Sequence, residues 1–189
     1  MRIEVPGTAA MEDFGRELGA QLRAGDLVVL TGPLGAGKTT LTRGIGEGLG
    51  VRGPVQSPTF VLARTHPSLV GGAPLVHVDA YRLGSAAELE DLDLDFAGSV
   101  VVVEWGTGLL DDVSDSWLDV VIARSRGGEG AGGSGAAGGA DAAAPGAAEP
   151  WAPDEELDAD EPRTLTVHGH GPRWAGTPFA ADIGADARR

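Results

Sequence analysis

A glycine-rich octapeptide carries the clearest chemical signal in the 189-residue sequence. Residues 32–39 read Gly-Pro-Leu-Gly-Ala-Gly-Lys-Thr and match the pattern Gly-x4-Gly-Lys-[Ser/Thr]. In this pattern the glycines turn backbone amides towards phosphates, the lysine reaches the terminal phosphates and the hydroxyl ligates Mg²⁺. The loop therefore predicts a site for a nucleoside triphosphate and Mg²⁺, and its candidate contacts are Gly35, Ala36, Gly37, Lys38, Thr39 and Thr40.

Lys38 is the only lysine of the chain, and the other thirteen basic residues are arginines. A lone lysine at the position where the loop requires one argues against the alternative, a glycine-rich turn that only caps a helix. The count also excludes the Asn-Lys-x-Asp motif that forms a guanine pocket, which favours ATP over GTP. No second arginine-rich segment follows the loop as a lid, which argues against a nucleotide kinase.

Two acidic residues end apolar strands and are candidates to hold Mg²⁺ or its water ligands. Asp79 follows His77-Val78, and Glu104 follows the valine run 100–103. Either carboxylate could instead cap a helix or lie solvated at a strand end, and the spacing leaves open which of them touches the metal. His77 lies inside an apolar strand, so we expect a buried supporting histidine and not a metal ligand.

Two further segments accompany these acids. The segment Gln56–Phe60 lies where such proteins often sense the terminal phosphate, although a Ser-Pro turn explains it equally well. Tyr81 and Arg82 follow Asp79 in a turn, where they could contact a partner protein or tRNA.

Alternating strands and helices must position these residues. Apolar spacing predicts an amphipathic helix over 8–22, and a second helix should run from about Lys38 to Leu49. Ser85 and Glu88 form a capping box that predicts a short acidic helix. Strands are expected at 27–31, 74–79, 99–104, 118–122 and 164–168. The loop therefore lies between a buried strand and a helix, which is the context that its chemistry requires.

A glycine-, alanine- and acid-rich segment interrupts this pattern between Ser125 and Pro162. It has nine acidic residues and one arginine, so it holds −8 of the net charge of −14 and leaves −6 on the rest of the chain. Such a composition buries too little apolar surface to order a chain, so we predict a disordered insertion in a hairpin of the last two strands. The predicted organisation is a core over 1–124, the insertion 125–162, a completing strand 163–170 and a flexible tail 171–189.

Composition limits the possible environments and partners. The sequence has no cysteine, no apolar run of about 20 residues and no signal-peptide core in residues 1–6, so we expect a cytoplasmic protein without membrane contact. The acidic balance argues against a broad nucleic-acid surface, and hence against DNA as a partner.

Five motifs in a fixed order resemble the bacterial TsaE (YjeE) family. They are Gly32–Thr40, Ser57–Phe60, His77–Leu83, Glu88–Leu92 and Val103–Trp105. The resemblance runs from the N-terminus to about Ile122 and resumes at about Arg163, so it leaves out the insertion and the tail.

The resemblance implies a single P-loop α/β domain with a mostly parallel central sheet flanked by helices. It also implies an ATPase required for N6-threonylcarbamoyladenosine at position 37 of tRNA, which acts bound to TsaD and TsaB and reaches tRNA only through that complex. Carried over to this sequence, Lys38, Asp79 and Glu104 are the catalytic candidates, and Thr39, Glu104 and Asp79 the metal candidates. The resemblance implies that Trp105, Thr8 and Arg163 are further nucleotide contacts.

Two other functions remain open at this point. The chain could be a small-molecule phosphotransferase, or an ATP-dependent binding switch in which hydrolysis is incidental.

Overall fold

The computed structural model describes residues 1–83, 85–110, 113–124 and 161–180 of the chain. The predicted disordered insertion lies outside the described residues except for Glu161 and Pro162.

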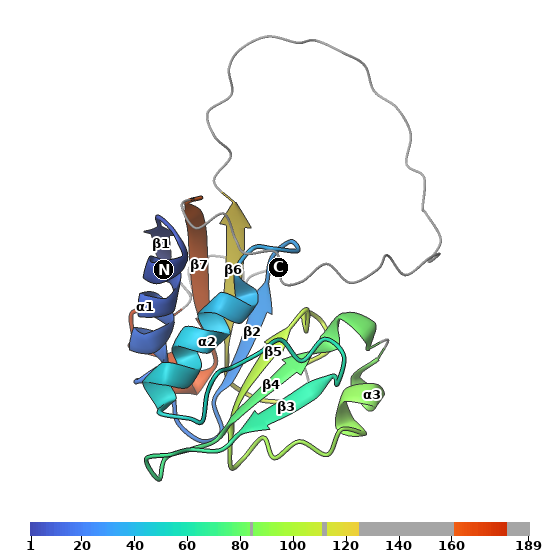
Figure 1. The fold of residues 1–189 in the computed structure, drawn as a ribbon. Coiled ribbons are helices and arrows are strands. Elements are labelled where there is room, and N and C mark those ends of the chain that lie inside the picture. Colours follow the sequence, from blue (N-terminus) through green and yellow to red (C-terminus); the bar gives the residue numbers. More distant parts are fainter. Residues whose placement is uncertain (84, 111–112, 125–160, 181–189) are drawn as a thin grey trace, which may run out of the picture.

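A seven-stranded sheet in the order β1-β7-β6-β2-β5-β4-β3 organises the described residues (Figure 1). The central strands β6, β2, β5 and β4 pair in parallel, and the remaining pairs, β1–β7, β7–β6 and β4–β3, are antiparallel. The sheet is therefore mixed, with a parallel centre, where the sequence predicted a mostly parallel sheet. Its strands are β1 (Arg2–Val5), β2 (Leu27–Thr31), β3 (Ala63–His66), β4 (Leu75–Asp79), β5 (Val100–Glu104), β6 (Trp117–Arg124) and β7 (Arg163–His170).

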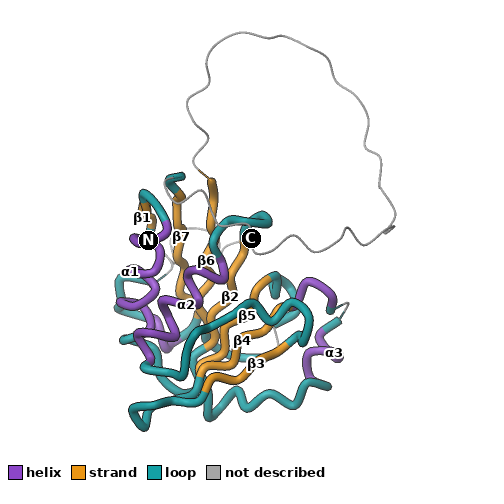
Figure 2. Tube along the Cα trace, in the orientation of Figure 1, coloured by secondary structure: helices purple, strands orange, loops and turns teal. Residues whose placement is uncertain are grey.

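Helices α1 (Thr8–Gly19) and α2 (Lys38–Leu49) lie side by side against the half of the sheet that contains β1, β7, β6 and β2 (Figures 1 and 2). Their backbones approach closely, because a Cβ on Gly44 would lie 2.3 Å from the carbonyl oxygen of Glu12. A Cβ on Gly48 would lie 2.2 Å from the carbonyl oxygen of Arg16. These contacts advance together along both helices, so α1 and α2 run parallel and begin at the same edge of the sheet.

The remaining helical segments are short. They are α3 (Ala86–Glu90) and the 3-10 turns η1 (Ala80–Arg82) and η2 (Pro172–Trp174). Ser85 caps α3 as predicted, because its hydroxyl accepts a hydrogen bond from the Glu88 amide at 3.4 Å.

Alternate side chains of the central strands pack into two separate hydrophobic cores. Val28 and Leu30 of β2 pack in the cluster beneath α1 and α2, whereas Leu27 and Val29 pack in the cluster on the opposite face. Both faces of the central strands are therefore covered, as expected for parallel strands whose side chains are almost all apolar.

The predicted hairpin of the last two strands is confirmed. β6 and β7 pair antiparallel in a register that runs from Trp117↔His170 to Arg124↔Arg163. The ends of this hairpin at Arg124 and Arg163 flank residues 125–162, so the long insertion starts and ends at one edge of the sheet.

Residues 171–180 differ from the predicted tail. Trp174 is 1% exposed and Phe179 is 4% exposed, and both belong to the core cluster beneath the two long helices. Phe179 also accepts a backbone hydrogen bond from Gly169 of β7. The segment is therefore part of the compact domain, while residues 181–189 lie outside the described residues.

Candidate functional site

The carboxyl ends of three parallel strands meet at one edge of the sheet. β2 ends at Thr31, β4 at Asp79 and β5 at Glu104, and Asp79 lies opposite Glu104 in the register. The loop of residues 32–37 leaves β2 at this edge and leads directly into α2. Ligands of open α/β sheets bind at such an edge, outside the carboxyl ends of the strands.

The loop depends on glycine backbone conformations. Gly35 has φ +71° and Gly37 has φ +102°, a region that other residues adopt only with strain. Gly37 also caps the start of α2, so the free amides of the first helical turn face the loop. A helix N-terminus of this kind attracts anions through its amides and its dipole. Of the other predicted contacts, Ala36 is fully buried and Thr40 is 7% exposed.

Lys38 folds back onto the loop. Its ammonium group donates hydrogen bonds to the carbonyl oxygens of Gly32 at 3.0 Å and Pro33 at 3.1 Å. It also lies 3.9 Å from the ring centroid of Trp105. Burial lowers the pKa of Lys38, while the nearby carboxylates of Glu104 and Asp79 oppose this shift.

Thr39, Glu104 and His77 form a hydrogen-bonded set beside the lysine. The Thr39 hydroxyl donates to Glu104 Oε1 at 3.0 Å, and His77 Nε2 lies 2.8 Å from the same oxygen. Glu104 is 5% exposed and His77 is fully buried. Within the described part of the chain, no hydrogen bond involves the second carboxylate oxygen, Oε2.

Asp79 lies next to Glu104 but has a different contact. One of its carboxylate oxygens, Oδ1, accepts a hydrogen bond from the Tyr81 amide at 3.0 Å and so caps the turn η1. The Tyr81 ring meets Trp105 edge to face, with centroids 5.5 Å apart. The alternative role of Asp79 as a helix cap therefore accounts for its hydrogen bond with Tyr81. The carboxylate is still near enough to Lys38 to oppose the lowering of the lysine pKa.

Thr8 and Arg163 lie at the same edge of the sheet as the loop. Thr8 is the first residue of α1, which begins beside the start of α2, and Arg163 begins β7. Arg163 is 3% exposed, and its guanidinium pairs with Glu161 at 2.8 Å and donates to the Glu161 carbonyl. Both of these contacts are with Glu161, two residues earlier in the chain.

Arg124 was missed by the sequence analysis and lies directly against the loop. Its guanidinium donates to the carbonyl oxygen of Leu34 at 3.4 Å. A Cβ on Gly35 would lie 2.7 Å from the same guanidinium, so the glycine makes room for the arginine. Arg124 ends β6 outside any motif, and only the strand register could have indicated its place.

The segment Gln56–Phe60 contacts η1. The carbonyl oxygen of Thr59 accepts a hydrogen bond from Arg82, and the guanidinium of Arg82 lies 5.6 Å from the Phe60 ring. Ser57 and Thr59 join their hydroxyl groups at 2.7 Å. Phe60 and Tyr81 are more than 70% exposed, so this part of the edge presents aromatic surface.

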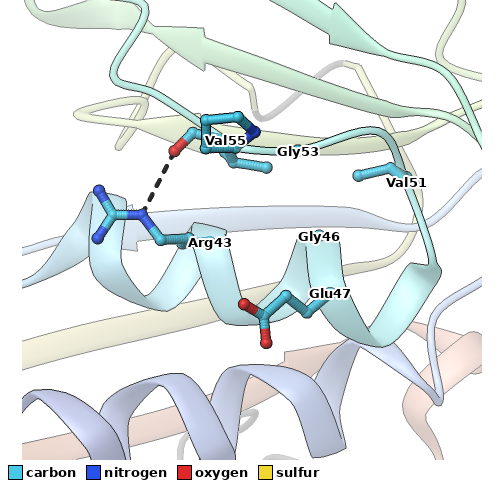
Figure 3. A pocket seen from close by; sticks show the side chains of 7 residues that line it. Arg43, Gly46, Glu47, Val51, Gly53 and Val55 are labelled. Atoms are coloured by element: carbon cyan, nitrogen blue, oxygen red, sulfur yellow. Dashed lines mark hydrogen bonds between the residues drawn. The ribbon is translucent and has the colours of Figure 1, made fainter.

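A separate pocket lies between α2 and the segment that follows it (Figure 3). Arg43 points across it and donates to the carbonyl oxygen of Val55 at 3.4 Å, while Glu47 lies one turn further along the helix. Gly46, Val51, Gly53 and Pro54 complete the lining. None of the predicted site residues lines this pocket.

The described residues lack two other kinds of site. No helix there has the length and apolar character needed to span a bilayer. No group of three or more histidine, cysteine or acidic side chains there could hold a metal. A site built from one or two side chains and substrate phosphates is the arrangement that Mg²⁺ commonly uses.

Known proteins resemble this chain in sequence and in fold. Residues 5–129 match the family model described as "Threonylcarbamoyl adenosine biosynthesis protein TsaE". The tRNA threonylcarbamoyladenosine biosynthesis protein TsaE of Streptomyces coelicolor is 51% identical over 168 residues, which cover 87% of this chain and 94% of that protein. The protein of the same name from Bacillus subtilis is 42% identical over 54% of this chain and 65% of that protein.

A solved structure supports the same grouping. The crystal structure of YdiB from Bacillus subtilis superimposes with a TM-score of 0.59 at 26% identity. The match covers 92% of this chain and 86% of that one.

Proposed function

The chain belongs to the TsaE family, whose members take part in tRNA threonylcarbamoyladenosine biosynthesis, and we propose that within this pathway it is an ATPase acting in complex with TsaD and TsaB. It binds ATP with Mg²⁺ at the Gly32–Thr39 loop and hydrolyses it, while the chemistry on the tRNA belongs to the partner proteins. The observation that carries the proposal is the contact of Thr39 with Glu104 at the start of α2.

The loop and Lys38 bind the phosphates. Backbone amides of the loop and of the first turn of α2 would donate hydrogen bonds to the phosphate oxygens. Lys38 exchanges its hydrogen bonds to the Gly32 and Pro33 carbonyls for phosphate oxygens. Because phosphates add negative charge beside the ammonium group, they oppose the effect of burial on the pKa of Lys38.

Thr39 and Glu104 hold the metal. Their hydroxyl and carboxylate oxygens are the hard donors that Mg²⁺ prefers, and Glu104 Oε2 is free of hydrogen bonds among the described residues, so the donor set fits this ion. A threonine of the loop and an acid at the end of a neighbouring strand hold the metal in P-loop ATPases generally. Bound Mg²⁺ neutralises charge that develops on the phosphates during transfer. Asp79, one strand further along, orients the attacking water.

Partner stimulation tests the proposal. We expect the purified protein to hydrolyse ATP slowly alone and faster when the TsaD and TsaB proteins are added. ATP binding without any response to these partners would remove the main support for a role in the complex. A small-molecule acceptor that is phosphorylated faster than ATP is hydrolysed would establish a phosphotransferase instead.

A Glu104→Ala variant separates hydrolysis from a binding switch. We expect it to bind ATP, to hydrolyse it very slowly and to fail to support tRNA modification in cells depleted of the native protein. Nucleoside analysis of tRNA measures the modification directly. Full levels of threonylcarbamoyladenosine with this variant would instead favour a switch whose hydrolysis is incidental.

A further inference from the structure

His77 is a fully buried polar side chain without a role in the reaction proposed above. It lies in the middle of β4 and is 0% exposed. Its Nε2 atom lies 2.8 Å from Glu104 Oε1, and its Nδ1 atom is buried without a hydrogen-bond partner in the described part of the chain. The imidazole therefore has a single polar contact, and that contact is the carboxylate beside the loop.

The strand register explains why these two side chains meet. β4 and β5 are parallel, with His77 opposite Val102 and Asp79 opposite Glu104. His77 lies opposite Val102, and Glu104 follows Val102 by two residues, so the three side chains point to the same face of the sheet. Leu75, Val100 and Val102 on that face belong to the apolar core beneath α1 and α2. The imidazole thus reaches Glu104 from inside the core.

The contact fixes one carboxylate oxygen and leaves the other available. Glu104 Oε1 accepts hydrogen bonds from Thr39 on the loop side and from His77 on the core side. A carboxylate held at one oxygen by two donors has little freedom to rotate. Its Oε2 atom is therefore held in a fixed direction and is free of hydrogen bonds among the described residues.

We propose that His77 is a positioning residue, which donates a hydrogen bond from Nε2 to Glu104 Oε1 and thereby orients Oε2 towards the metal of a bound ATP·Mg²⁺. The inference rests on the proposed function, because it takes Glu104 as the metal-binding acid. Donors that orient a ligating carboxylate typically contribute about 10- to 100-fold in metal affinity or activity. The role passes through Glu104, because His77 has no other polar contact among the described residues.

Two amide substitutions separate the hydrogen bond from the volume of the ring. The amide nitrogen of glutamine lies as many bonds from the backbone as histidine Nε2, so His77→Gln keeps a donor that reaches Glu104. The amide nitrogen of asparagine corresponds to Nδ1, so His77→Asn keeps polarity but loses the contact. A His77→Leu variant removes both nitrogens and retains an apolar side chain in the core.

The first readout is metal binding without turnover. The full-length protein is titrated with Mn²⁺ in place of Mg²⁺ and in the presence of a non-hydrolysable ATP analogue. Electron paramagnetic resonance measures the Mn²⁺ that remains free in solution. We expect His77→Gln to bind Mn²⁺ within about threefold of wild type, and His77→Asn and His77→Leu to bind it about tenfold more weakly. Analogue affinity without metal should stay unchanged in all variants, and circular dichroism checks that each is folded.

A double-mutant cycle with Glu104→Gln provides the second readout. If His77 acts through Glu104, His77→Asn should not weaken Mn²⁺ binding further once Glu104 is already replaced. The proposal is overturned if folded His77→Asn and His77→Leu bind Mn²⁺ like wild type, or if His77→Gln binds it as weakly as His77→Asn. It is also overturned if the losses of Mn²⁺ affinity caused by the two single substitutions add up fully in the double variant. Failure of the proposed function looks different, since wild type itself would then bind no Mn²⁺ with the analogue.

Discussion

Two buried carboxylates at opposite ends of the central strands have different partners. Asp26 precedes β2 and is 4% exposed, and Glu104 ends β5 and is 5% exposed. The Arg173 guanidinium holds both oxygens of Asp26, at 2.9 and 3.0 Å, and the Arg23 amide adds a third donor. Among the described residues, Glu104 accepts only from a hydroxyl and an imidazole, both at one oxygen.

Under the proposed function, this difference separates a structural edge of the sheet from the edge that binds and hydrolyses ATP. The charge of Asp26 is balanced within the chain by a fork-shaped pair, which is the geometry of the stronger charge-assisted hydrogen bonds. Glu104 has no arginine partner and keeps one oxygen free of hydrogen bonds among the described residues. Changes at the Glu104 edge should therefore affect ATP chemistry more than folding, and changes at the Asp26 edge should do the reverse.

The largest effect is expected from Lys38→Ala. Because Lys38 is the only lysine and lies in the loop, its loss should reduce ATP hydrolysis on the order of 100-fold or more. The melting temperature should change little, since the contacts of the ammonium group with described residues are limited to two loop carbonyls and a tryptophan ring. Steady-state hydrolysis and thermal unfolding measure the two quantities. Near-normal hydrolysis in the folded variant would rule out the assignment of the loop.

The complementary change is Arg173→Ala at the other edge. It leaves Asp26 buried without its cation, which should lower the free energy of unfolding by about 3 kcal/mol. This is the low end of the usual range, because Arg173 is partly exposed. The melting temperature should fall by about 10 °C, while the affinity for ATP of the folded protein stays the same. Arg2→Ala, which removes an exposed arginine, is the matched control, and equal stability of both variants would contradict the comparison.

A smaller effect is expected from Gly35→Ala. A side chain at φ +71° is strained by roughly 1 kcal/mol, and its Cβ would meet the Arg124 guanidinium at 2.7 Å. ATP affinity should fall about tenfold as the loop shifts. Gly71→Ala is the control, because it has φ +77° with nothing within 4 Å of the added Cβ. Calorimetric titration with ATP should detect a loss for Gly35→Ala alone, and equal affinities would show that the loop tolerates the change.

Local signals predicted the strand and the helix that flank the loop. β2 and α2 have the expected bounds, because a short buried strand, a glycine-rich turn and a helix start follow each other within a few residues. Thr39 and Glu104 were chosen as metal candidates from their residue types and positions. Their contact, and the one between His77 and Glu104, depends on which strands are neighbours, and no local pattern encodes this order.

The elements that the sequence did not predict depend on distant partners. β1 is only four residues long, has two charged residues and exists through pairing with β7 near the other end of the chain. β3, which reads Ala-Arg-Thr-His, contains no large apolar residue. Trp174 and Phe179 follow a glycine- and proline-containing turn without periodicity, so their burial was not visible before the fold was known.

The most direct test of the account is the Mg²⁺ dependence of ATP hydrolysis in Glu104→Gln, measured with TsaD and TsaB present. The substitution keeps the size of the side chain and removes its charge, so the protein should remain folded and retain binding of ATP itself. We predict that hydrolysis falls on the order of 100-fold and that half-maximal activity requires more Mg²⁺ than in wild type. A folded Glu104→Gln protein with the wild-type rate and the wild-type Mg²⁺ dependence would contradict the assignment of this edge as the reactive one.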